Sequence, residues 1–231
     1  MNNEMLIKGN PLRGILRRSF LLILIFTFHL SPFTSFAQIT HNSQGRLDEN
    51  ATAALEKCAK KLKNVSGTVT LTVFDSQKKV VAKQTADVKY SSGKYSLKME
   101  GQEIVSDGVT VWHLNNSAKE VTIENVSDDD IDLLNPGRML QNYNKSFRAK
   151  YIRTDDDGTV VVDMQPRSSR SYHKIRLFIN EESGALNRIE VHKYDSSREV
   201  YEFSKCKYGK VGGSFKFDPK AHPGMEIIDM R

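Results

Sequence analysis

Histidines are the side chains in this sequence best suited to acid–base chemistry, and their spacing does not support a reaction centre. No histidine has a second histidine two or four positions away, the spacing that brings two metal ligands to one face of an element. A Gly-x-Ser-x-Gly nucleophile turn and a Gly-rich phosphate loop are also missing. We therefore expect no enzyme, no catalytic residue, no metal site and no cofactor. Surface or packing roles are expected for His41, His113, His173, His192 and His222.

Two acidic clusters could suggest cation binding. A calcium loop spreads its oxygen ligands over about a dozen residues and closes with a glutamate. In 155–158 the sequence Asp-Asp-Asp-Gly is followed at once by an apolar alternation, which predicts a turn between strands. The Ser-Asp-Asp-Asp cluster at 127–130 is expected to be a solvated loop or a helix start. The alternative for that cluster is a docking surface for a basic partner.

Cys58 and Cys206 are the only cysteines. An oxidising compartment would allow one disulfide between them, but the sequence does not show whether they come within bonding range. Two readings stay open, a bridge or two buried thiols.

The first 37 residues have the pattern of a cleavable export signal. Basic residues precede an apolar run at 20–30, and Ser35-Phe36-Ala37 is a small-x-small cleavage pattern. The apolar run is too short to span a bilayer comfortably, so an uncleaved anchor is the weaker alternative. The expected organisation is a signal peptide over 1–37, a flexible mature N-terminus over 38–46 and one folded domain over 47–231.

The charge of the chain does not predict nucleic-acid binding. The formal net charge is +6, but four of the 34 basic and one of the 28 acidic residues lie in the signal, which leaves +3. No basic stripe interleaved with aromatic residues is present.

The expected structure is one helix followed by a long antiparallel meander. Residues 47–62 carry apolar side chains at helical spacing, and Asp48 or Asn50 can cap the helix. From residue 65 the apolar period changes to two, with turns about every eight to twelve residues. Residues 128–143 interrupt the alternation with a short apolar helix around Pro136-Gly137. We predict an α+β fold, a single curved antiparallel sheet of about eleven strands that forms an incomplete, half-open β-barrel, with an N-terminal helix and short lid helices over an apolar cavity.

The apolar residues of the sheet and lid admit two interpretations. They can fill one another as an ordinary core, which is the usual role of such stripes. They can instead line a pocket for lipid, in which flexible methionines would suit irregular acyl chains. The candidate lipid-binding residues are Val69, Leu71, Val88, Leu97, Met99, Trp112, Leu133, Leu134, Met139, Leu140, Tyr143, Phe147 and Met164.

Several motifs resemble the LolA family of outer-membrane lipoprotein carriers. They are SDGVTVWHL at 106–114, KEVTIENV at 119–126 and LLNPGRML at 133–140, then SYHKIRLFINEESGALNRIEVH at 171–192 and FKFDPKAHPGMEIID at 215–229. Together and in this order, behind an export signal, they resemble that family over nearly the whole mature chain. The early strand at 65–74 departs from the family pattern because it contains no arginine to hold the lid.

The resemblance implies a monomeric periplasmic carrier without catalytic activity. Its cargo would be lipoprotein acyl chains, taken from an inner-membrane lipoprotein-releasing transporter and passed to an outer-membrane acceptor. One alternative is a binding protein for another lipid or amphiphile, such as a glycolipid. An exported hydrolase with an unrecognised site and a structural envelope domain with a filled interior are the remaining alternatives.

Overall fold

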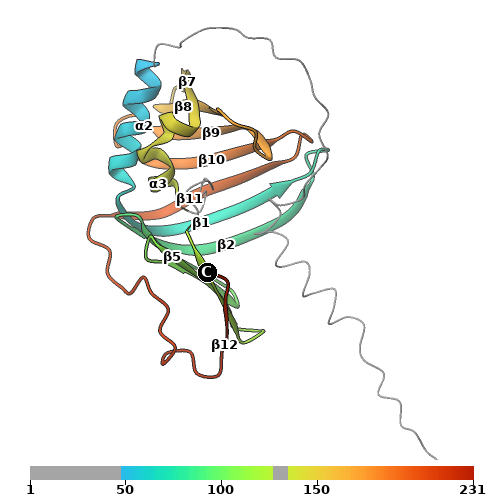
Figure 1. Ribbon diagram of the computed structural model, residues 1–231. Coiled ribbons are helices and arrows are strands. Elements are labelled where there is room, and N and C mark those ends of the chain that lie inside the picture. The colour runs from blue at the N-terminus through green and yellow to red at the C-terminus, as the bar shows by residue number, and fades with distance from the viewer. Residues whose placement is uncertain (1–47, 127–134) are drawn as a thin grey trace, which may run out of the picture. The chain divides into compact units, whose positions relative to one another are not determined.

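The computed structural model describes residues 48–126 and 135–231 (Figure 1). They form a mostly β structure in which three helices accompany one twelve-stranded sheet. The helices are α2 (Glu49–Lys61), α3 (Pro136–Gln141) and α4 (Tyr143–Ser146). The strands are β1 (Asn64–Phe74), β2 (Val80–Ser91), β3 (Lys94–Met99), β4 (Gln102–Ser106), β5 (Thr110–Asn115), β6 (Glu120–Asn125), β7 (Phe147–Thr154), β8 (Thr159–Pro166), β9 (Tyr172–Asn180), β10 (Leu186–Lys193), β11 (Arg198–Tyr208) and β12 (Glu226–Asp229).

Helix α2 forms where the apolar spacing predicted a helix. Asp48 caps it by accepting a hydrogen bond from the Ala51 backbone N–H at 3.0 Å, which satisfies one of the unpaired donors at the helix start. The second carboxylate oxygen of Asp48 accepts the Tyr151 N–H at 2.9 Å and so ties the helix start to β7. Ala51, Leu55 and Cys58 are fully buried along one stripe of the helix.

The sheet order is β12-β6-β5-β4-β3-β2-β1-β11-β10-β9-β8-β7. Neighbouring strands are antiparallel apart from the β12–β6 pair, as expected for strands joined by short turns. The acidic segment 155–158 is the β7–β8 turn, closed by a bond from the Gly158 N–H to the Asp155 carbonyl at 2.9 Å. The turn prediction for this segment is therefore confirmed.

The C-terminal segment differs from the expectation of about eleven antiparallel strands. Residues 226–229 add a twelfth strand, parallel to β6, with Glu226 opposite Glu120. Residues 209–225 connect β11 to this strand, which is therefore far along the chain from its parallel neighbour β6. The sequence did not suggest this strand because four residues give too short an alternation to recognise.

The pairing register divides the sheet into an inner face and an outer face. Leu71, Gln84 and Tyr201 lie side by side across β1, β2 and β11. The same row of paired residues continues with Ile189 on β10 and Leu177 on β9. These residues define the inner face, on which α2, α3 and α4 pack (Figure 1). The alternate residues define the outer face.

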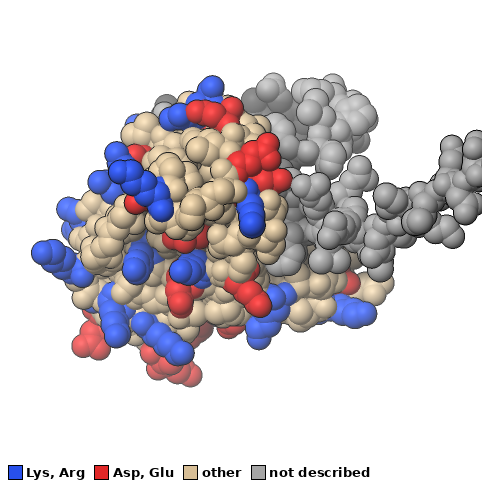
Figure 2. All heavy atoms as spheres, turned by 90° about the horizontal axis from the view of Figure 1, so that it is seen from below, with Lys and Arg blue, Asp and Glu red and all other residues tan. Residues whose placement is uncertain are grey.

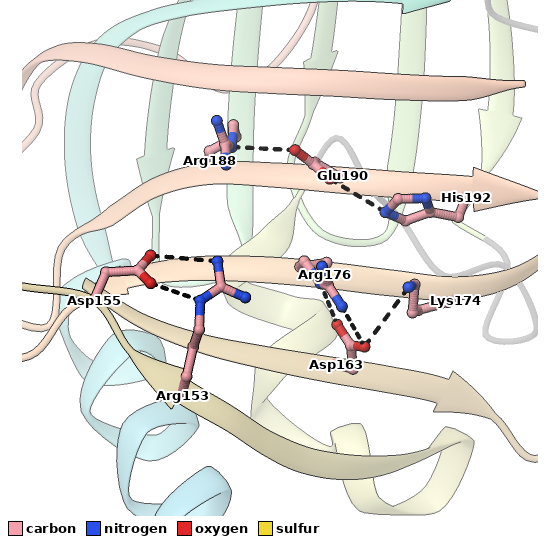
Figure 3. Close-up of polar contacts among 8 residues, drawn as sticks. All are labelled: Arg153, Asp155, Asp163, Lys174, Arg176, Arg188, Glu190 and His192. Atoms are coloured by element: carbon pink, nitrogen blue, oxygen red, sulfur yellow. Dashed lines mark hydrogen bonds and ion pairs between the residues drawn. The ribbon is translucent and has the colours of Figure 1, made fainter. Parts of the chain in front are cut away.

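The outer face of β8–β10 is held together by ion pairs rather than by a second apolar layer (Figure 3). Arg176 donates two hydrogen bonds to Asp163, at 2.6 and 2.9 Å, and Lys174 Nζ lies 3.7 Å from the same carboxylate. Burial alone would raise the pKa of Asp163, but the Arg176 hydrogen bonds and the Lys174 charge outweigh it and lower the pKa. Glu190 lies between Arg188 and His192 in the same way, at 3.4 and 3.2 Å.

Basic and acidic side chains are interspersed over the face seen in Figure 2. None of the helices in 48–126 and 135–231 is long and apolar enough to cross a membrane.

Candidate functional site

The inner face gathers most of the strand residues predicted to contact lipid. Val69 and Leu71 alternate along β1, and Val88, Leu97 and Met99 continue the same face across β2 and β3. Phe147 and Met164 lie on this face at the other end of the sheet, as the β7–β8 register requires. Seven predicted residues from β1, β2, β3, β7 and β8 therefore share one surface.

Trp112 lies on the opposite face of the sheet from the other predicted strand residues. Its partners across β4 and β6 are Val105 and Ile123, and this row lies on the outer face because Ile104, not Val105, lies opposite Leu97. There Trp112 packs with Val105, Leu114 and Val121 against the C-terminal side chains Phe215, Phe217 and Met225. A strand has side chains on both faces, so the apolar character of a residue does not by itself determine its face.

Helices α3 and α4 cover part of the inner face with the predicted lid residues. Pro136 begins α3, where its missing N–H costs nothing, and the Asn135 side chain caps the helix by accepting the Arg138 N–H at 3.1 Å. Met139, Leu140 and Tyr143 are at most 8% exposed. Leu133, Leu134 and the acidic segment 127–130 lie outside the described residues.

Two side-chain hydrogen bonds hold this cover at opposite ends. The Asn135 amide donates to the Gly93 carbonyl in the β2–β3 turn at 3.0 Å. The Tyr143 hydroxyl lies 3.0 Å from the Thr52 hydroxyl of α2. Between them, Gly137 lies so close to Leu62 that a Cβ there would stand 3.4 Å from the Leu62 carbonyl oxygen. These contacts join α3 and α4 to α2 and to the β2–β3 turn.

Exposure of the inner face increases along β1 and β2, away from the helices. Val65 and Val69 near the helices are 3% and 7% exposed, whereas Leu71 and Val73 farther along β1 are only half-buried. On β2, exposure rises in the same direction, from the buried Val88 and Ala86 to the half-buried Gln84 and Ala82. The apolar surface is therefore closed beneath the helices and opens toward the β1–β2 hairpin tip.

A strip of polar side chains crosses the open part of the inner face. The sequence pattern did not lead us to predict this strip. Lys193 Nζ lies 2.6 Å from Glu199, and the second oxygen of Glu199 accepts the Tyr201 hydroxyl at 2.9 Å. Burial, and then the Glu199 charge, raises the pKa of Tyr201 well above its ordinary value. The alternation of Glu199 with Tyr201 and Phe203 was the available signal, because it places a charge on the apolar side of β11.

A half-open hollow of about 340 Å³ lies between α2 and the ends of β7–β9. Its walls combine apolar and polar side chains, and Lys57 Nζ donates to the Glu181 carbonyl at 2.6 Å at its edge. The expected cavity was apolar and beneath the lid, whereas this hollow lies on the other side of α2 from the open inner face.

Both cysteines are free thiols in the structure. Burial raises the pKa of Cys58 to about 12, and burial also raises the pKa of Cys206. The second reading, two buried thiols, describes Cys58, whereas Cys206 is only half-buried.

The tertiary structure brings together one pair of histidines that the sequence separates. The rings of His173 and His192 are 6.2 Å apart, centre to centre, and Tyr194 lies 5.5 Å from His173. Over 48–126 and 135–231, however, no group of three histidine, cysteine or acidic residues is placed to hold a metal ion.

Solved structures show where this architecture recurs. An uncharacterized conserved protein from Thermus thermophilus aligns with 78% of this chain and 99% of its own length, at 12% identity and a TM-score of 0.55. A LolA superfamily protein from Nitrosomonas europaea aligns with 70% of this chain and 94% of its own, at 13% identity and a TM-score of 0.39. MucB of Pseudomonas aeruginosa, solved in complex with MucA, aligns with 71% of this chain and 59% of its own length, at 16% identity and a TM-score of 0.43. At these identities only the fold is comparable, and only the first alignment is close enough to support that comparison.

No curated protein sequence matches the chain. The family model described as outer membrane lipoprotein carrier protein LolA matches residues 60–219, which is more than half of the chain. Proteins of that family are carriers rather than enzymes, and the family indicates an envelope protein. On the strength of this match the chain belongs to the LolA family.

Proposed function

We propose that this protein is a periplasmic carrier that holds the acyl chains of lipoproteins on its inner face. It would receive them from an inner-membrane lipoprotein-releasing transporter and deliver them to an outer-membrane acceptor. The observation that carries this function is the graded inner face, apolar along β1–β3, covered at one end and open at the other.

Acyl chains need such a surface to cross an aqueous compartment. Each methylene exposed to water costs about 0.8 kcal/mol, so two or three chains cost on the order of tens of kcal/mol. The half-buried Leu71 and Val73 offer apolar area that the fold itself has not used. Binding there would remove lipid and protein surface from water together.

Release requires a cover that moves without unfolding the sheet. The described contacts of α3 and α4 are mainly apolar, supplemented by the Asn135–Gly93 and Tyr143–Thr52 hydrogen bonds. Apolar contacts can be exchanged for equivalent contacts with an acyl chain, which keeps the cost of displacement small.

Native mass spectrometry of protein purified from the cell envelope tests the function directly. We expect the wild-type chain to carry lipoprotein, and Leu71→Asp to lose it because a carboxylate would stand on the lipid-contacting surface. Thr70→Asp is the matched control, since Thr70 is the neighbouring residue on the outer face and pairs with Thr85.

The result distinguishes the alternatives. If a glycolipid or another lipid co-purifies in place of lipoprotein, the inner face is still the binding surface but the cargo is that lipid. Equal lipoprotein loading of the wild type, Leu71→Asp and Thr70→Asp would contradict the role of the inner face.

A further inference from the structure

Two hairpin tips lie side by side at the open end of the sheet (Figure 1). Phe74, the last residue of β1, pairs with Val80 of β2 on one side and with Arg198 of β11 on the other. The β1–β2 and β10–β11 turns therefore project together. We call residues 74–83 and 194–198 the tip surface.

The tip surface exposes apolar side chains that the fold does not cover. Val80 is 48% exposed, Val81 58% and Tyr194 68%. The β1–β2 register shifts here, with Phe74 opposite Val80 and Val73 opposite Ala82, so Val81 is left without a partner on β1 in a β-bulge. Both valines are exposed at the projecting end of the hairpin, where they can enter a fluid layer.

Cations surround these apolar residues. Lys78, Lys79 and Lys83 have no ion-pair partner within the part of the chain that the structure describes. The Arg198 guanidinium lies over the Phe74 ring, 4.5 Å from its centre. Both acidic residues of the tip surface are engaged in their own turns.

The carboxylate of Asp75 accepts the Gln77 and Lys79 backbone N–H groups, both at 2.9 Å. Asp195 accepts the Ser197 N–H at 2.9 Å and the Ser197 hydroxyl at 2.6 Å. Neither carboxylate forms an ion pair with the lysines, so the tip surface presents more positive than negative charge to a partner.

We propose that the tip surface docks on an anionic lipid bilayer. Lys78, Lys79 and Lys83 would be attracted to the charged headgroups of such a surface. Val80, Val81 and Tyr194 would then enter the headgroup layer, where small apolar side chains and tyrosine are both favoured. The membrane contact involves no cargo, so it is independent of the proposed carrier function.

Vesicle sedimentation of the full mature chain without cargo tests this docking. We expect binding to vesicles of phosphatidylcholine with phosphatidylglycerol, little binding to phosphatidylcholine alone, and weaker binding as salt is raised. Lys78→Gln/Lys79→Gln should lower the partition coefficient roughly thirtyfold. Val80→Asp/Val81→Asp should lower it by roughly tenfold or more.

Matched variants at the opposite end of the strands locate the effect. Val109→Asp changes a valine that is 69% exposed in the β4–β5 turn, and Lys94→Gln/Lys145→Gln removes two exposed lysines far from the tip surface. These variants should bind as the wild type does. Thermal unfolding by circular dichroism checks that all variants fold, which is expected because every altered side chain is exposed.

Three outcomes would overturn the proposal. The first is no binding to either vesicle, which would indicate that the tip surface binds an acidic protein and not a membrane. The second is equal, salt-insensitive binding to both vesicles. The third is an equal loss in the tip variants and the matched variants.

Discussion

The two halves of the sheet use the same alternating pattern for different purposes. On β8–β10 the inner-face residues Val162, Met164, Ile175, Leu177 and Ile189 are all fully buried. On β1–β3 the same face is buried at Val69, Val88 and Leu97, but Leu71, Val73 and Met99 are only half-buried. The outer faces differ too, because ion pairs of Asp163 and Glu190 support the closed half.

The difference separates the half that forms the buried core from the half that leaves apolar surface partly exposed. Closed packing gives a rigid core because side chains interdigitate without voids. In the open half, the apolar face lies beside the Lys193–Glu199–Tyr201 strip and beneath a partial cover. Substitutions at equivalent positions of the two halves should therefore have very different consequences.

Leucine truncation on the two halves should give the largest contrast. We expect Leu177→Ala to lower the free energy of unfolding by about 4 kcal/mol, because it leaves a cavity in a fully buried site. Leu71→Ala should cost only about 1 kcal/mol, since its side chain is already partly in water. Urea unfolding followed by circular dichroism measures both. Equal losses would mean that the open half is also core.

Removing the central carboxylate of the closed half should have the next largest effect. Asp163→Asn leaves Arg176 and Lys174 without their shared counter-charge and should cost about 3 kcal/mol at neutral pH. The pKa of Asp163 is lowered in the folded chain, so its stabilisation is present above the ordinary aspartate pKa and is lost as pH falls through the folded value. The difference between wild type and variant should therefore shrink in acid, and a difference that grew would contradict the ion-pair account.

Trp112 provides a spectroscopic test of the assignment of faces, because it is the only tryptophan. Phe217→Ala should shift its emission to longer wavelength and cost about 1–2 kcal/mol, since Phe217 packs against the same buried cluster as Trp112. Cargo loading and Leu71→Ala should leave the emission unchanged, because both act on the other face. A change in Trp112 emission on cargo loading would contradict this assignment and indicate that Trp112 belongs to the binding surface.

The cover should respond to the loss of its cap with the smallest change in stability. Asn135→Ala removes both the bond from the Arg138 N–H and the bond to the Gly93 carbonyl, and should cost about 1 kcal/mol. Hydrogen exchange should accelerate in α3 and not in α2. Asn142→Ala is the matched control, because the Asn142 side chain makes no cap bond to α4. Similar exchange in both variants would show that the Asn135 bonds do not hold the cover.

Much of this architecture was predictable because local spacing controls local structure. The α2 helix, its Asp48 cap, the long meander and the 155–158 turn all depend on residues within a few positions of one another. The set of inner-face residues was also largely predictable, since a period of two puts alternate residues on one face.

Other features depend on residues far apart in the chain. The face on which Trp112 lies is set by the β3–β4 register. The same face is covered by Phe215 and Phe217, which lie about a hundred residues later in the chain. The β12 pairing and the adjoining hairpin tips likewise depend on which distant strands become neighbours.

By itself, the sequence determined a helix followed by an alternating, apolar-faced sheet, because secondary structure and burial periodicity are encoded at short range. Only the tertiary structure decided that one half of the inner face is closed and the other open. Closure depends on where α2, α3 and α4 pack over the sheet, and that position is set by long-range contacts such as Asn135 with Gly93 and Thr52 with Tyr143.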